Sequence, residues 1–207
     1  VIIMSRAEGL LIHVPPGVKA TEPVRLDLLT ERDTLSRVTV LAEEGSQVVI
    51  AENSFGSADV IRDSSVEVIV GDNASVTFAA IQHRNGKGDF AAKNGRVGKN
   101  GRLRWVDATF GCEFARSSIS TSLEGEGADV VTRSAFFGRG RQRFDLSVAA
   151  KHLASQTASD LTGVGAADNE SKAIYHGLIR MERGTRNCDG RQREDALMLS
   201  DKAEIDA

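Results

Sequence analysis

Proline and aromatic residues are scarce in this sequence of 207 residues, of which aromatic residues make up 5%. The three prolines are Pro15, Pro16 and Pro23, so none follows residue 23. Because proline lacks the amide hydrogen that a sheet needs, its absence permits long uninterrupted strand pairing. The 20 glycines are spread along the whole chain and supply turn residues that accept a positive φ. The composition therefore favours strands joined by tight turns.

Cysteines and long apolar runs are also few. Cys112 and Cys188 lie far apart and neither belongs to a CxxC motif, which excludes a disulfide framework and a complete local zinc or cluster site. No stretch reaches the 18 apolar residues of a membrane span, and Glu8 interrupts the opening apolar patch, so no convincing signal peptide is present. We therefore expect a cytoplasmic protein in a reducing compartment, without a membrane partner.

No charge of one sign dominates the chain. It carries 26 Lys and Arg against 29 Asp and Glu, a net charge of -3, which argues against nucleic-acid binding. One segment, residues 83–104, has seven Lys or Arg against a single Asp. Because aromatic residues are sparse there, we interpret it as a set of solvated turn residues rather than a nucleic-acid site.

Familiar catalytic motifs are absent as well. The sequence has no GxxxxGK[ST] phosphate loop, no GxGxxG, no GxSxG elbow and no HExxH. The chain is therefore not itself expected to be an ATPase, and no residue is predicted to be catalytic.

A repeat of 27 to 28 residues is the strongest positive signal. Four turn residues mark it: Gly45, Asn73, Asn100 and Gly127. An apolar residue follows each of them by three positions, and these residues are Val48, Val76, Leu103 and Val130. They recur at intervals of 28, 27 and 27 residues. Two positions further on lie Ile50, Phe78, Trp105 and Thr132. A unit of this size cannot bury its own apolar face, so neighbouring units must stack.

Stacked short strands with period-2 alternation predict an all-β protein, either a β-solenoid or a regular sandwich. We favour the solenoid, specifically a right-handed parallel β-helix of short strands, with residues 1–207 forming one domain. Amphipathic helices between the strands are missing, which excludes an α/β organisation. Only residues 191–203, with their Leu197 to Leu199 cluster, can alternatively be interpreted as a helix.

The candidate functional residues are two cysteines and two histidines. His152 and His176 lie inside polar–apolar alternations, and a solenoid can bring such distant residues together. Cys188 has Arg186 nearby, and local positive charge is what a thiolate ligand or persulfide carrier needs. Cys112 is interpreted as a small buried filler. These four residues are the candidate metal or cluster ligands.

The segment from Gly138 onward resembles the core of the SufB/SufD family of iron–sulfur cluster assembly scaffolds. Four pieces carry the resemblance, in order along the chain: a Gln-x-Phe-Asp run, an H-x-A-x-x-T-x-S-D segment, a Y-H-G-L-I segment and an L-x-L-S-D-K-A close. They occupy residues 142–145, 152–160, 175–179 and 197–203. The upstream HVPPGV segment and the repeats are compatible with the same family.

The resemblance implies a parallel β-helix core and a scaffold rather than a catalyst. Family members form a complex in which a SufB-type and a SufD-type subunit pair, each binds a SufC ATPase, and a nascent cluster is built and passed to acceptor proteins. The implied partners are thus a SufC-like ATPase, a SufB-like or identical β-helix subunit, and iron–sulfur acceptor proteins. The implied cofactor is a transient iron–sulfur cluster within the complex, with none in the isolated chain.

Departures from the family pattern favour a SufD-like paralogue or an archaeal member with mixed features. Glu194 stands where SufB-type members carry a functional cysteine, and Cys188 lies six residues earlier, so that role is not transferred to it. The sequence starts without methionine and stops inside the repeat pattern, so we expect a fragment lacking flanking N- and C-terminal helical regions. Two alternatives stay open: a carbohydrate-active or other β-helix enzyme, and a purely structural β-helix interaction module.

Overall fold

The computed structural model describes residues 1–6, 9–57 and 59–207, and within these ranges it contains strands and turns but no helix. Nine strands form one sheet: β1 (Ile2–Arg6), β2 (Gly9–Val14), β4 (Thr34–Ala42), β6 (Ile61–Val70), β8 (Gly88–Val97), β10 (Phe114–Leu123), β12 (Arg143–His152), β14 (Lys172–Met181) and β16 (Glu204–Asp206). Seven form the other: β3 (Val24–Leu29), β5 (Gln47–Phe55), β7 (Ser75–Gln82), β9 (Arg102–Thr109), β11 (Asp129–Gly138), β13 (Ala158–Ala167) and β15 (Asp189–Met198).

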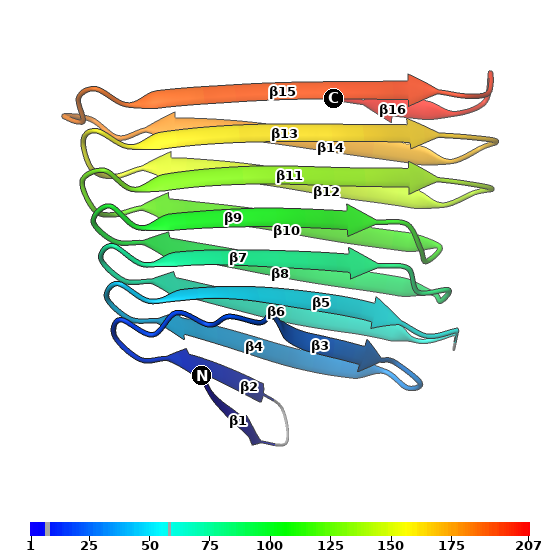
Figure 1. Ribbon diagram of the computed structural model, residues 1–207. Helices are drawn as coiled ribbons and strands as arrows, with labels where there is room; N and C mark the ends of the chain where they lie inside the picture. Colours follow the sequence, from blue (N-terminus) through cyan, green and yellow to red (C-terminus); the bar gives the residue numbers. More distant parts are fainter. Residues whose placement is uncertain (7–8, 58) are drawn as a thin grey trace.

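From β2 onward, successive strands alternate between the two sheets, as Figure 1 shows. Within each sheet the neighbours are parallel, for example β5 with β7 and β10 with β12. The exception is β1, which pairs with β2 in antiparallel orientation at one edge. The chain is therefore a parallel β-solenoid of about seven turns, which confirms the predicted all-β solenoid. In the described part of the chain, no helix is long and apolar enough to cross a membrane.

The strand register confirms the repeat residue by residue. Val48 pairs with Val76, Val76 with Leu103, and Leu103 with Val130. All four side chains are at most 1% exposed. The second row pairs in the same way and is also buried; it consists of Ile50, Phe78, Trp105 and Thr132. The spacing read from the sequence is thus one full turn of the solenoid.

The four predicted turn residues all have a positive φ. The values are 66° for Gly45, 57° for Asn73, 52° for Asn100 and 74° for Gly127. Glycine has no steric penalty in this region, and asparagine tolerates it better than other side chains. The same conformation therefore recurs at one corner of successive turns and sets the strands in register.

The strands are longer than the apolar alternation that predicted them. β6 has ten residues, but only its last half, Val66 to Val70, is apolar on the inward side. Its first half buries Arg62 and Ser64 instead. We call the interior at the Val48 end of the strands the apolar half. We call the interior at the Arg62 end the polar half. Its buried polar and charged residues between the start of β5 and the end of β10 include Glu52, Ser54, Arg62, Ser64, Gln82, Arg84, Asp89, Lys93, Asp107, Thr109 and Ser117.

Two sequence-based interpretations need correction. The basic segment at residues 83–104 is not a uniformly solvated set of turn residues, because Arg84 is 0% and Lys93 6% exposed. Both form ion pairs inside the solenoid. The alternative helix at residues 191–203 is also wrong, since β15 covers most of that segment. Backbone pairing of β15 with β13 determines its conformation.

Candidate functional site

The polar half contains an ion-pair cluster between the two sheets. Arg62 of β6 donates to Glu52 of β5 at 3.0 Å and to Asp89 of β8 at 3.4 Å. Arg84, in the loop after β7, donates to Asp89 at 3.3 Å. Each of these side chains is at most 4% exposed. Two positive and two negative groups balance one another, which is what makes their burial tolerable.

A second buried ion pair lies beside this cluster. The Lys93 ammonium of β8 contacts the Asp107 carboxylate of β9. Ser117 of β10 donates to the other oxygen of that carboxylate at 2.9 Å. Asp107 is therefore held by a charge and a hydroxyl from two neighbouring strands. The polar half thus contains two separate groups of hydrogen-bonded side chains, one around Arg62 and one around Asp107.

Cys112 lies in the loop between β9 and β10, where the polar half meets the surface. Its thiol accepts hydrogen bonds from Gln82 Nε2 at 3.2 Å and Arg84 Nη1 at 3.6 Å. Burial raises its pKa to about 11, and the Asp89 charge contributes to the rise. Cys112 has a φ of 67° and is 2% exposed. Its thiol is therefore buried and protonated at neutral pH. The predicted burial of Cys112 is confirmed.

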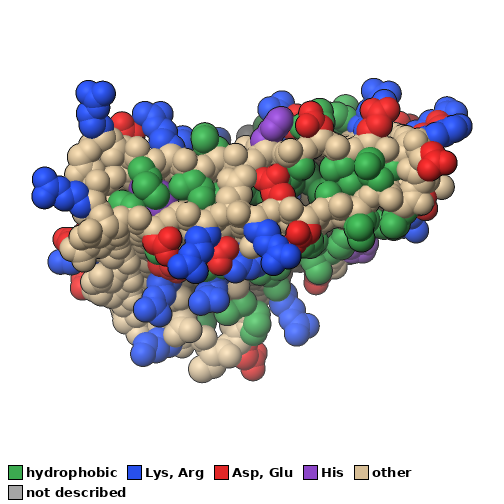
Figure 2. Space-filling view, turned by 90° about the horizontal axis from the view of Figure 1, so that it is seen from above, with side chains coloured by type: hydrophobic (Ala, Val, Ile, Leu, Met, Phe, Trp, Pro, Cys, Tyr) green, Lys and Arg blue, Asp and Glu red, His purple; other side chains and the backbone are tan. Residues whose placement is uncertain are grey.

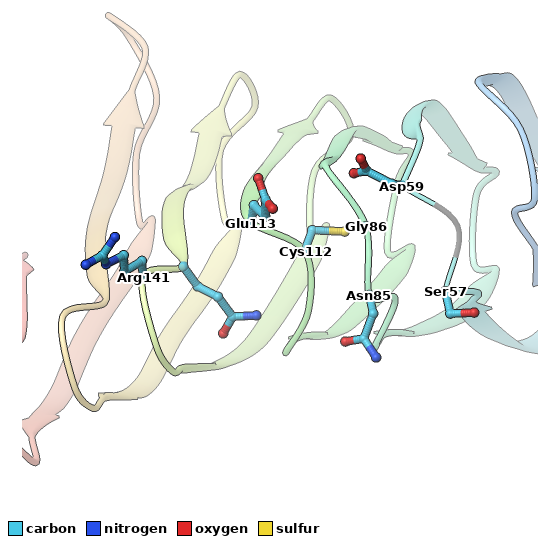
Figure 3. A pocket seen from close by; sticks show the side chains of 8 residues that line it. Ser57, Asp59, Asn85, Gly86, Cys112, Glu113 and Arg141 are labelled. Carbon is cyan, nitrogen blue, oxygen red and sulfur yellow. The ribbon is translucent and has the colours of Figure 1, made fainter.

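A surface pocket of about 800 Å³ opens beside Cys112 (Figure 3). Loops from four successive turns line it, and the lining residues are Ser57, Asp59, Asn85, Gly86, Cys112, Glu113, Arg141 and Gln142. The charged groups of the pocket are thus the carboxylates of Asp59 and Glu113 and the guanidinium of Arg141. Gly111 lets this loop pack closely, because a Cβ there would lie 1.9 Å from the Arg84 carbonyl oxygen.

Cys188 lies at the opposite ends of the strands, in the loop between β14 and β15. Its side chain is half-buried, and the Thr157 hydroxyl donates to its sulfur at 3.3 Å. Burial acts to raise the pKa of Cys188, but hydrogen bonds from Thr157, Thr185 and the backbone outweigh it and lower the pKa below its ordinary value. Cys188 is therefore the more readily ionised of the two thiols.

His152 ends β12 and is fully buried. Its Nδ1 lies 2.7 Å from the Thr157 hydroxyl and its Nε2 lies 2.8 Å from the Ser159 hydroxyl. Burial lowers the pKa of His152 and the charge of Asp189 opposes this, so the neutral ring is favoured. The structure thus brings two of the sequence candidates together, His152 and Cys188, with Thr157 between them. Thr157 and Ser159 are both fixed positions of the H-x-A-x-x-T-x-S-D segment, which is the signal that could have identified them.

The four candidates do not form one site. His176 lies on the outward side of β14, exposed and opposite Ser147 of β12. Cys112 lies at one end of the strands and the His152–Cys188 pair at the other. Across residues 1–6, 9–57 and 59–207, no three His, Cys, Asp or Glu side chains are close enough together to hold a metal ion.

The fold and these buried residues define a parallel β-solenoid protein whose interior is apolar in one half and polar in the other. Residues 28–207 match the model of the family described as "SUF system FeS cluster assembly, SufBD core domain". The chain therefore belongs to the SufBD core domain family, as its motifs indicated.

Individual relatives agree with this family. The iron–sulfur cluster assembly protein SufD of Bacillus subtilis is 28% identical over 96% of this chain and 47% of its own length. A SufBD family protein of Mycobacterium leprae is 26% identical over 93% of this chain and 23% of its own length. A SufBD family protein of Porphyra purpurea is 21% identical over 96% of this chain and 44% of its own length. The chain thus spans about half or less of the length of these curated relatives.

Proposed function

We propose that this chain is a scaffold subunit of a cytoplasmic iron–sulfur cluster assembly complex, acting without catalysing the chemistry itself. Its partners are a SufB-like or identical β-helix subunit and a SufC-like ATPase, and its cargo is a cluster that acceptor proteins receive. The observation that carries the proposal is the SufBD core match over residues 28–207, which coincides with nearly all the turns of the solenoid.

The last described turn leaves its inward rows exposed. Met181 and Met198 continue the inward rows of His152 and Ala167, two residues that are completely buried. The two methionines are nevertheless 48% and 63% exposed. Figure 2 looks at this end and shows apolar side chains on it. These rows offer apolar surface to a further layer of protein, whether a following part of the polypeptide or a second subunit.

A rigid solenoid also suits the assembly of a cluster. Iron and sulfide arrive in steps, so the groups that receive them need fixed separations. In the middle turns each strand pairs with the next over its whole length, as β10 does with β12 and β11 with β13, which fixes the positions of side chains at the turn corners. The half-buried Cys188, held by Thr157 beside His152, is the group of the described chain that we propose to contact the cluster or the partner.

The test is co-purification of the full-length gene product with a SufB-type partner and a SufC-type ATPase, followed by anaerobic loading with iron and sulfide. We expect a stable complex that gains the visible absorbance of a cluster. A chain that binds neither partner under these conditions contradicts the proposal and leaves only the fold.

Two cysteine substitutions sharpen this test. Cys188→Ser should reduce cluster loading of the intact complex, whereas Cys112→Ala should leave it unchanged. Equal loading in both variants argues against a role for Cys188.

A further inference from the structure

A small cavity lies inside the solenoid and is lined in part by residues of the polar half. It offers about 10 Å³ to the centre of a water molecule, which is close to the smallest space that holds one. Its polar lining includes Asp107 and Thr109 of β9, Ser117 of β10, Ser134 of β11 and Tyr175 of β14. The lining residues therefore come from both sheets and from three successive turns.

Two hydrogen-bonded groups line this cavity, and they are adjacent in one sheet because Ser134 of β11 pairs in register with Asp107 of β9. In one group Ser117 donates to Asp107, which is also paired with Lys93. In the other group the Tyr175 hydroxyl lies 2.7 Å from the Ser134 hydroxyl. Asp107, Ser117 and Tyr175 are each at most 7% exposed. No direct hydrogen bond between the two groups is present among the described side chains.

The position of Tyr175 depends on a glycine of the opposite sheet. A Cβ at Gly163 would lie 2.5 Å from Cζ of Tyr175 and 2.7 Å from its hydroxyl oxygen. The ring therefore fills the space that a side chain at this position of β13 would occupy. Tyr175 reaches the cavity because residue 163 has no side chain.

We propose that this cavity binds one ordered water molecule, which joins the Asp107–Ser117 group to the Ser134–Tyr175 group by hydrogen bonds. Several hydroxyls and one carboxylate line the cavity, whereas a buried water needs two to four polar partners. Water fits better than a metal cation, because the Lys93 ammonium already neutralises the only carboxylate in the lining.

The water connects the only tyrosine of the chain to an ion pair in the middle of the solenoid. The charged groups that act on the Tyr175 hydroxyl are Asp107 of β9, with its partner Lys93 of β8, and Glu194 of β15. Burial raises the pKa of Tyr175, the hydrogen bond from Ser134 lowers it, and the charges of Glu194 and Asp107 raise it further. The absorbance of phenolate therefore reports on this cavity without interference from another tyrosine.

The first test is a crystal structure of the full chain at a resolution that shows ordered water. We expect one water peak within hydrogen-bond distance of Tyr175 or Ser134 on one side and of Asp107 or Ser117 on the other. An empty cavity, or a peak that contacts one side only, overturns the proposal. This result does not depend on any variant that could fail to fold.

Two substitutions at one position provide the second test. Ser134→Thr keeps the hydroxyl and adds a methyl group that occupies the cavity, so the water peak should disappear and the alkaline titration of Tyr175 should shift. Ser134→Ala removes the hydroxyl but leaves the space, so the water peak should remain. A Tyr175 titration in Ser134→Thr that matches the wild-type chain contradicts the connection.

Discussion

The two halves of the solenoid interior solve the problem of stacking in different ways. In the apolar half, rows of Val, Ile, Leu, Phe and Trp fill the space between the sheets, and Trp105 lies 5.5 Å from Phe78, centroid to centroid. In the polar half, Glu52, Arg62 and Asp89 and the Lys93–Asp107 pair occupy inward strand positions, and Arg84 joins them from the loop after β7. Both halves use the same strands and the same register.

This difference teaches that strand pairing does not require an apolar interior along the whole strand. A substitution that shortens one side chain in an apolar row removes contacts only around that side chain. Buried charges are mutually dependent, because each one needs its partner to offset the loss of water. We therefore expect the apolar half to contribute stability through burial of apolar area, and the polar half to disfavour any stacking of turns that separates its charged partners. Four predictions test this comparison.

The largest effect is expected from breaking the Lys93–Asp107 pair. Lys93→Met leaves a buried carboxylate without its cation and should lower the free energy of unfolding by about 3–5 kcal/mol. The double variant Lys93→Met/Asp107→Leu should recover most of this loss, because it removes both charges. Denaturant unfolding of the three proteins measures both values. A double variant as unstable as the single one contradicts the view that unpaired charge is the cause.

A truncation in the apolar half should cost somewhat less. Leu103 is fully buried between Val76 and Val130, so Leu103→Ala should lower the free energy of unfolding by about 2–5 kcal/mol. The exposed Leu153, at 45%, provides the control, and Leu153→Ala should change stability by less than about 0.5 kcal/mol. Urea unfolding of both variants makes the comparison, and equal losses would show that burial is not the deciding factor.

The two thiols should differ strongly in reactivity. At pH 8 a thiol with a pKa of about 11 is ionised in roughly one molecule in a thousand, and Cys112 is also buried. Cys188, with its lowered pKa and partial exposure, should react with a thiol reagent at least about a hundred times faster. Labelling rates of Cys112→Ala and Cys188→Ala, measured separately, give the ratio. Comparable labelling rates would show that the Cys112 and Cys188 thiols do not differ in reactivity.

The smallest effect is a pH dependence from the one histidine of the apolar half. Because burial lowers the pKa of His152 in the folded chain, the unfolded chain binds a proton more readily. Stability from this residue is complete above the unfolded pKa of about 6.5 and is lost as the pH falls, by at most about 1.4 kcal/mol per pH unit. The slope of unfolding free energy against pH should be reduced in His152→Gln; an unchanged slope excludes His152 as its source.

The candidate site was predictable only in part. His152 and Cys188 are identifiable from residue type and motif, but their connection through Thr157 requires the loops before β13 and β15 to stack. Cys112 could be assigned as a buried filler, whereas its contacts with Gln82 and Arg84 depend on the preceding turn. His176 lies in a recognisable motif, yet its outward position follows from the register of β14 and brings it to neither cysteine.

The sequence by itself determined the repeat, the corners and the apolar rows. Val48, Val76, Leu103 and Val130 could be aligned because apolar residues recur once per turn, and Gly45 and Asn73 identified corners because few residue types accept a positive φ. Only the tertiary structure decided which charged residues lie inside. A strand with Arg62 or Lys93 has the same alternation whether those side chains face water or an opposite charge, and the partners Glu52 and Asp107 come from the other sheet. Burial of a charge depends on a neighbour that the local sequence does not contain.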